Sequence, residues 1–236
     1  MTRTLADSRR WMRDGTELLL LSVATLDHEQ LVAQSALPGW ARRHLVAHLA
    51  ANADAVGNLV RWAATGEPTP MYASLEERAA GIEQGSRRAG DELSEWLRSS
   101  AEKLEAAMSS LTAKQWRAQV RTAQGRTVEA AEVPWMRARE IWVHAVDLAT
   151  GISFDDLPAD FLTELCTDVI GKRGAGAGPA LVLEPDDRTQ RWELPGDGAA
   201  VRLGGPLAEL AAYLTGRPHR LTAADGGPAP VLSPWL

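Results

Sequence analysis

The chain has 236 residues, of which 45% are hydrophobic and 24% charged, and it carries a net charge of −6 at pH 7. This composition is typical of a globular protein with one large core or two modest ones. No apolar run reaches the roughly 18 residues that a membrane-spanning helix needs. The negative charge and the lack of clustered Lys and Arg argue against nucleic acid as the main partner, since binding phosphates requires a basic face. The N-terminal segment lacks a secretory apolar core, which predicts a cytoplasmic protein.

The first half of the chain is patterned as amphipathic helices. Residues 4–27 carry apolar side chains at helical spacing, and Asp27 with Gln30 is typical of a capping box that opens a short second helix. A long helix is expected over residues 41–65, with Gly66 as its C-terminal stop.

Two more helical segments follow. Ser74 is a candidate N-cap for a helix that is expected to continue to about Met108. The next helix is expected over residues 130–150, where Pro134 is tolerable only close to the first turn and Gly151 provides the stop. Helices of this length with apolar stripes predict a four-helix bundle, in which side chains from facing helices can build a metal site.

The pattern changes after the helical region, which predicts two domains, a helical bundle over residues 1–152 and a small α/β domain over residues 153–236. The glycine-rich stretch 171–178 is interpreted as a mobile connection, because it lacks the Gly-Lys-Ser/Thr of a phosphate loop. Three short strands and one helix are expected after it, over residues 179–184, 190–194, 200–203 and 207–214.

Cys166 is the only cysteine of the chain. A single cysteine cannot form an internal disulfide, which fits a reducing compartment. Its helix-like surroundings favour a small buried hydrophobe over a catalytic nucleophile, because no base or cation lies nearby in the sequence. Any thiol chemistry in this protein is therefore expected to use a thiol from outside the chain.

The segment with the most chemical content holds Glu140 and His144, four residues apart in an apolar helical pattern. Side chains at this spacing share one helical face and can reach one cation. Upstream, His44 and His48 lie in a second apolar helix and could complete the set. Two histidines and one carboxylate leave a tetrahedral zinc ion with one open position, as in catalytic sites. Taken alone, however, the pattern also fits a solvated glutamate with a packing histidine.

Several longer stretches occur in order along nearly the whole chain and point to one family. They are Leu37–Trp40, His44–His48, Thr65–Glu67, Thr69–Tyr72, Thr122–Asp147, Leu214–Arg217 and Pro234–Leu236. Through these stretches the chain resembles the mycothiol-dependent maleylpyruvate isomerases.

The resemblance implies a DinB-type metal-binding bundle followed by a small C-terminal α/β domain, with zinc and mycothiol as cofactors. By position, the metal ligands of the family fall on His48, Glu140 and His144, and its catalytic arginine falls on Arg217. The implied activity is cis–trans isomerisation of maleylpyruvate to fumarylpyruvate in the gentisate pathway of aromatic catabolism. The alternatives are a mycothiol S-transferase acting on other electrophiles and a non-catalytic metal- or thiol-binding regulatory module.

Other polar residues are candidates for contact with mycothiol. Asn52 lies one turn beyond His48 and could bind the thiol or substrate, or satisfy a backbone group instead. Gln124, in the loop ahead of the ligand helix, is expected to contact the cofactor. Arg126 in the same loop could do so too, although loop arginines are more often plain surface charges.

Some candidates keep two interpretations. His44 could be a ligand in place of His48, or a supporting or packing residue. Trp40 and Trp135 flank the two ligand helices, where an indole could wall a pocket. Arg217 could cap the carbonyls of its own helix instead of binding substrate, in which case Arg220 is the substitute anion clamp.

Overall fold

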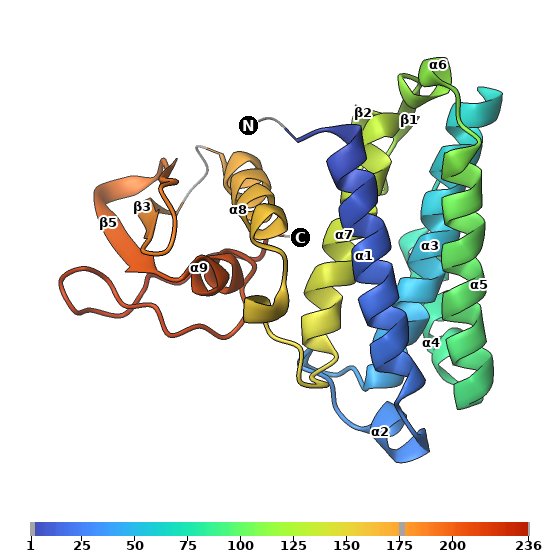
Figure 1. Ribbon diagram of the computed structural model, residues 1–236, viewed down its shortest axis with the longest axis horizontal. Helices are drawn as coiled ribbons and strands as arrows, with labels where there is room; N and C mark the ends of the chain where they lie inside the picture. The colour runs from blue at the N-terminus through green and yellow to red at the C-terminus, as the bar shows by residue number, and fades with distance from the viewer. Residues whose placement is uncertain (1–2, 175–177, 236) are drawn as a thin grey trace. The chain divides into compact units, whose positions relative to one another are not determined.

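The computed structural model describes residues 3–174 and 178–235. The chain divides into two compact units, with the boundary between Ile152 and Ser153 (Figure 1). The first is a helical bundle and the second combines a small sheet with helices, which confirms the expected fold class. Along these described residues, no helix is both long enough and apolar enough to cross a membrane.

The first unit is built around its long helices. Its elements are α1 (Leu5–Ala24), α2 (His28–Val32), α3 (Arg42–Thr65), α4 (Leu75–Ser86), α5 (Gly90–Ser109), α6 (Ala113–Trp116), β1 (Gln119–Arg121), β2 (Thr127–Glu129), the 3-10 turn η1 (Ala130–Glu132) and α7 (Val133–Asp147). Helix α3 packs against α5, α4 and α7, and α1 packs against α7 and α5 (Figure 1). The bundle core between them is apolar and includes the fully buried side chains of Leu45, Leu49, Leu59, Leu97 and Ile141.

Local capping explains where several helices begin and end. The hydroxyl of Thr4 accepts from the backbone N–H of Asp7, whose carboxylate accepts from the Thr4 backbone N–H in return. Asp27 and Gln30 form the capping box that the sequence predicted at the start of α2. Gly66 ends α3 with a φ of 79°, a left-handed conformation that favours glycine.

The expectation of one helix from Ser74 to about Met108 is wrong. Residues 87–89 separate α4 from α5. Both helices pack on α3, which requires the chain to turn between them. Gly85 lets the ring of Trp96 on α5 lie close to the backbone of α4, because a Cβ at that position would lie only 2.5 Å from the ring. Tertiary packing therefore overrides the continuous helical pattern.

The helix expected over residues 130–150 is real but shorter. It begins as η1 and continues as α7, with Pro134 in the first turn as expected. It ends at Asp147, and Gly151 is not the stop. The chain leaves the helix because Ala149 takes a φ of 54°, a left-handed conformation that is uncommon for a residue with a side chain.

The sequence pattern does not reveal the hairpin that lies between α6 and α7. Strands β1 and β2 pair antiparallel, with Val120 opposite Val128, and the turn uses Gly125 at a φ of 79°. Val120 is buried on the bundle side and β1 packs against α3. Strands of three residues are too short to show the alternation from which strands are predicted.

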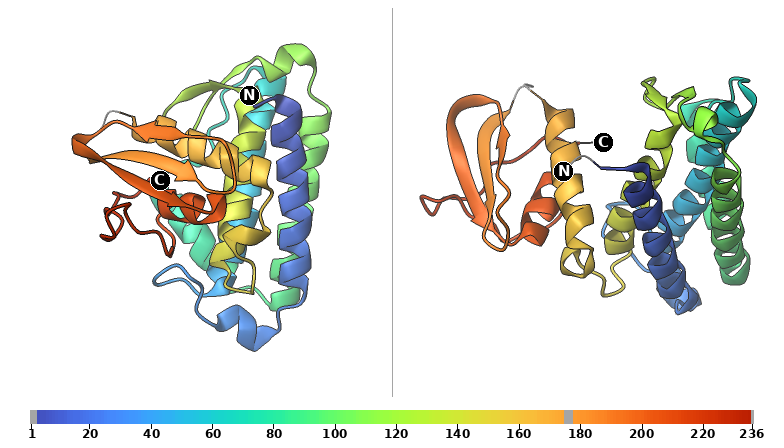
Figure 2. Two further views of the ribbon diagram at one scale, coloured as in Figure 1. Left: turned by 60° about the vertical axis from the view of Figure 1, so that its left-hand side comes forward. Right: turned by 45° about the horizontal axis from the view of Figure 1, so that its top comes forward.

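The second unit contains η2 (Phe154–Asp156), α8 (Ala159–Arg173), β3 (Pro179–Pro185), β4 (Trp192–Leu194), β5 (Asp197–Gly205) and α9 (Leu207–Leu214). Its described strands form a sheet in the order β4-β3-β5, with β3 antiparallel to β4 and parallel to β5. Both helices lie on the same face of this sheet, as Figure 2 shows. The predicted strands and the last helix are thus confirmed, with shifted ends for the strands.

The glycine-rich stretch 171–178 is not wholly a connection. Residues 171–173 form the last turn of α8. The helix is followed by Gly174 at a φ of 54°. The expected mobile connection falls in part on residues 175–177, which lie outside the described residues.

The close approach of α1 and α7 at Gly15 predicts a stability effect. A Cβ on Gly15 would lie 2.8 Å from the indole of Trp142 and 3.0 Å from Ile141. We expect Gly15→Ala to lower the free energy of unfolding by about 1–3 kcal/mol, the usual cost of overpacking. Gly57→Ala is the matched control, because Gly57 lies within α3 with open space at its Cβ position. The control should raise stability by up to about 1 kcal/mol. Urea unfolding of both variants checks the prediction, and equal effects would contradict it.

Candidate metal centre

Helices α3 and α7 bring the three predicted ligands together. The Nε2 atom of His48 lies 3.0 Å from Oε2 of Glu140, and Nε2 of His144 lies 3.5 Å from the same oxygen. One ligand atom from each residue can be chosen so that all three lie within 4.8 Å of one another. Such a group can hold a metal ion.

The separations fit a small tetrahedral ion. Zinc bonds to nitrogen and oxygen are roughly 2.0–2.2 Å long, so the ligand atoms of a tetrahedral site lie about 3.3–3.6 Å apart. The two distances from Glu140 to the imidazoles, 3.0 and 3.5 Å, are near that range. The donor set of two imidazoles and one carboxylate is the one expected for zinc with an open position.

Asp147 orients one of the imidazoles. Its carboxylate oxygen Oδ2 lies 2.8 Å from Nδ1 of His144, and the Asp147 side chain is only 1% exposed. This contact leaves Nε2 of His144 directed toward Glu140. A carboxylate behind a histidine is the usual outer partner of a metal ligand, because it fixes the ring and raises its basicity. Asp147 was not predicted as a site residue, although its i+3 spacing from His144 at the end of the helix was a usable signal.

The protonation states follow from burial and from these contacts. Burial lowers the pKa of His48, and this effect outweighs that of Glu140, which raises the same pKa. Burial also acts to lower the pKa of His144, but hydrogen bonds to Asp147 and Glu140 outweigh it and raise that pKa to about 9. Burial would raise the pKa of Glu140, yet His144 and His48 hold it well below its ordinary value. Without a metal, these shifts favour a proton on His144 and an ionised Glu140.

Trp40 forms part of the surroundings of His48. The two rings meet edge to face, with centroids 5.6 Å apart, and the His48 side chain is only 4% exposed. The expectation that Trp40 walls the site therefore agrees with the structure. Trp135 does not share this role, because it lies fully buried against Trp11 of α1, with ring centroids 5.6 Å apart.

His44 lies outside the cluster. Its Nδ1 atom accepts from the backbone N–H of Ala41 at 3.2 Å and so caps the start of α3. Its Nε2 atom lies 3.5 Å from a carboxylate oxygen of Glu83 on α4. Both ring nitrogens are thus directed to partners other than Glu140 and His144, and His44 is a supporting residue of the helix start.

A second polar layer lies one helical turn away from the cluster. Arg137 is 1% exposed, and its Nη1 donates to the carbonyl of Leu49 and to Oδ1 of Asn52, both at 2.8 Å. Burial lowers the pKa of Arg137 to about 10, while the negative charge of Glu140 acts to raise it. Asn52 is therefore fixed by a buried cation. Neither Arg137 nor this contact was predicted, because an arginine inside an apolar helix pattern ordinarily indicates a solvent-facing position.

Tyr72 and Arg78 belong to the same region. The Arg78 guanidinium lies over the ring of Tyr72, 5.7 Å from its centroid. Burial raises the pKa of Tyr72, while Arg78 and Asn52 lower it and Glu140 raises it. Tyr72 lies in one of the stretches that resemble the family, and no role was predicted for it.

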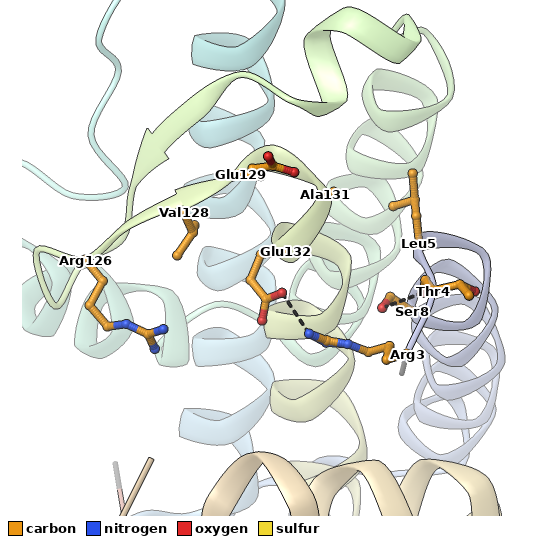
Figure 3. A pocket seen from close by; sticks show the side chains of 9 residues that line it. All are labelled: Arg3, Thr4, Leu5, Ser8, Arg126, Val128, Glu129, Ala131 and Glu132. Carbon is orange, nitrogen blue, oxygen red and sulfur yellow. Dashed lines mark hydrogen bonds and ion pairs between the residues drawn. The ribbon is translucent and has the colours of Figure 1, made fainter. Parts of the chain in front are cut away.

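Several residues of the β1–β2 hairpin line a pocket that is separate from the metal cluster. A pocket of about 430 Å³ opens beside the first turn of α1, and Figure 3 shows Arg126 pointing toward it and the 2.8 Å ion pair of Arg3 with Glu132 at its edge. Gln124 is exposed on the β1–β2 turn. The lining residues of this pocket do not include the His/Glu cluster.

The C-terminal unit holds the remaining candidates. The guanidinium of Arg217 donates to the carbonyl of Thr215 at the end of α9. Arg220 forms an ion pair with Glu209 at 2.7 Å and is mostly exposed. Cys166 is fully buried within α8, and burial raises its pKa to about 12, so that thiol is not ionised at neutral pH. This confirms the expected buried, unreactive cysteine.

Comparisons with known proteins point to one family. The family model of the mycothiol maleylpyruvate isomerase N-terminal domain matches residues 12–149, and that of the MDMPI C-terminal domain matches residues 156–234. A solved structure of mycothiol-dependent maleylpyruvate isomerase is 36% identical, with 98% of this chain and 99% of that chain covered and a TM-score of 0.91. The structure of a histidine-to-alanine mutant of that enzyme is 35% identical at the same coverage, with a TM-score of 0.90.

The search of curated proteins found no match. One family model alone covers more than half of the chain, and both solved structures exceed 30% identity over nearly its whole length. The chain therefore belongs to the mycothiol maleylpyruvate isomerase family.

Proposed function

We propose that this protein is a zinc-containing, mycothiol-dependent isomerase that converts maleylpyruvate to fumarylpyruvate. The convergence of His48, Glu140 and His144 carries the proposal, together with the family membership. Reversible addition of a thiolate to the cis double bond would leave a single bond that rotates, and loss of the thiolate would give the trans product. The gentisate pathway of aromatic catabolism is the proposed metabolic setting of this reaction.

In this proposal His48, Glu140 and His144 hold the metal, and Asp147 holds the ring of His144 in place. When bound by these residues, zinc would lower the pKa of a thiol so that the thiol ionises at neutral pH. The apolar helices on which these residues lie, and Trp40 beside His48, limit the access of water to the cluster.

The thiol comes from outside the chain. Cys166, the only cysteine, is fully buried and un-ionised, so mycothiol is the proposed nucleophile. We propose Asn52 and Gln124 as its contacts, Asn52 because it lies one turn from His48 in the buried layer. A lone reduced cysteine also supports the cytoplasm as the compartment.

Arg217 is the proposed anion clamp. A planar guanidinium can bind a carboxylate, or an oxygen that gains charge, through two parallel hydrogen bonds. The contact of Arg217 with the Thr215 carbonyl is compatible with this role, because a guanidinium has five N–H donors.

The proposed function predicts turnover of maleylpyruvate that needs both zinc and catalytic mycothiol. Purified protein, with its metal content measured, should isomerise maleylpyruvate with mycothiol and not without it. His144→Ala should abolish both zinc retention and turnover while the circular dichroism spectrum stays that of a helical bundle, because the bundle has its own apolar core. Mycothiol consumed in proportion to product would indicate an S-transferase instead. Absence of any rate enhancement would indicate a binding module.

Zinc affinity should rise with pH up to about 9. The folded protein holds a proton on His144 with a pKa near 9, and a metal must displace it. Below that pKa each unit of pH should therefore strengthen binding about tenfold, and above it the affinity should level off. Asp147→Asn removes the main hydrogen bond that raises this pKa, so its plateau should begin at lower pH. Competition with a chelator between pH 6 and 10 measures both curves. Identical curves for the wild type and Asp147→Asn would show that Asp147 does not raise the pKa of His144.

Arg217→Ala should lower kcat/KM by on the order of a hundredfold with zinc content unchanged, the scale for loss of one charged transition-state contact. Arg217→Lys should restore little, because the planar fork is lost. Arg220→Ala is the control, since Arg220 is engaged by Glu209 on the surface. If Arg217 only caps α9, its alanine variant will instead lower the melting temperature and keep near-normal turnover.

A further inference from the structure

A mainly apolar groove, here called the α1–α5 groove, lies between two neighbouring helices of the bundle (Figure 1). Its volume is about 320 Å³. This is at the lower end of the range for small-molecule sites, roughly 300–1,000 Å³. The apolar part of its lining consists of Met12, Leu20, Leu21, Ala101 and Leu104. Leu21 is 65% exposed, so the groove presents aliphatic surface that a ligand could cover.

Helix α7 contributes a buried cation, Arg137, to the lining of the same groove. Arg137 is 1% exposed, and its Nη1 donates to the carbonyl of Leu49 and to Oδ1 of Asn52, both on α3. The other terminal nitrogen, Nη2, is buried and has no hydrogen-bond partner within the described part of the chain. Burying an N–H group without an acceptor is costly. An acceptor that reached Nη2 from the groove would remove this cost.

The positive charge of Arg137 also lacks a close counterion. Among residues 3–174 and 178–235, no carboxylate oxygen lies within 4.0 Å of its guanidinium. Burial lowers the pKa of Arg137 to about 10, and the acidic groups that act against burial, Glu140, Tyr72 and Asp54, do not line the groove. A ligand group that brings both an acceptor and a negative charge therefore fits Nη2 better than a neutral acceptor.

The remaining charged side chains of the lining lie where solvent or a partner offsets them. Glu105 lies 2.7 Å from Arg9 and 3.8 Å from Arg13, so two cations of α1 neutralise its charge. Glu17 and Glu102 are exposed, where water and salt screen their charges. The charge of Arg137 is buried and is screened much less. An anion at Nη2 is therefore attracted more strongly than these glutamates repel it.

We propose that the α1–α5 groove binds an aliphatic carboxylate of medium chain length. Its carboxylate accepts from Nη2 of Arg137, and its alkyl chain covers the apolar lining, including exposed Leu21. One terminal nitrogen of Arg137 then holds the ligand while the other holds Asn52 and the α3 backbone. The site is separate from the candidate metal centre, because none of the three proposed metal ligands lines the groove.

The first test compares octanoate with octan-1-ol, which has the same chain length and no charge. Isothermal titration calorimetry should show one saturable octanoate site, with a Kd at least tenfold lower than that of octan-1-ol. Tenfold is the scale of a hydrogen bond to a charged group. Equal affinities would overturn the role of the carboxylate. Absence of saturable octanoate binding would overturn the site.

Arg137→Gln tests the ion pair. Glutamine removes the charge and keeps an amide that can donate to the Leu49 carbonyl, and circular dichroism checks that the variant is folded. Octanoate should then bind no more tightly than octan-1-ol, whose own affinity should stay that of the wild type. Wild-type octanoate affinity in this variant would overturn the assignment of the carboxylate to Arg137.

Ala101→Leu tests the location without changing Arg137, so it also decides the case if Arg137→Gln fails to fold. Ala101 is half-buried in the lining, and a leucine there fills part of the groove. We expect octanoate binding to weaken at least tenfold. Ala106→Leu is the matched control, because Ala106 is exposed on the same helix and does not line the groove. The control should bind octanoate as the wild type does. Equal binding by the two leucine variants would place the ligand elsewhere and overturn the proposal.

Discussion

The packing of α7 against α3 is the contact on which the candidate site depends. His48 and Glu140 come from different helices and meet at 3.0 Å only because apolar side chains hold those helices at a fixed separation. Leu45, Leu49 and Ile141 are fully buried around this contact. A close-packed core resists small displacements, so the geometry of the polar cluster is set by the apolar residues beside it.

The same contact orders the polar residues into layers. Helices α3 and α7 run antiparallel, since His48 meets Glu140 while Asn52, one turn further along α3, meets Arg137, one turn earlier on α7. The first layer carries the proposed metal ligands. The second is buried and holds the cation of Arg137, which fixes the side-chain amide of Asn52.

Buried charge is costly, and this bundle contains it in two places. Asp147 and Arg137 are each about 1% exposed. Removing such groups from water costs several kcal/mol unless hydrogen bonds and opposite charges offset it. Asp147 is paired with His144, and Arg137 donates to a carbonyl and to Asn52. Apolar residues would pack such a bundle more simply, so the charges are better explained by the site that they support.

The sequence by itself determined the main helices, the short strands of the second unit and the pairing of Glu140 with His144 on one helical face. Helical periodicity and capping residues act over a few positions, and Glu140 and His144 share a face through their spacing alone. The continuous helical pattern across residues 74–108 led to the wrong prediction of a single helix for the same reason. No local feature of the sequence signals that α4 and α5 both pack against α3. Strands of three residues were also below what periodicity can detect.

Only the tertiary structure decided which histidine joins α7 and what surrounds it. His44 and His48 are equivalent in the sequence pattern, but the orientation of α3 directs His48 to Glu140 and leaves His44 to cap the helix. Arg137 and Asn52 come from segments far apart in the chain, so their contact depends on the packing of α7 against α3. Contacts between distant segments arise from the shape of the whole core, and the spacing of residues along the chain does not encode them.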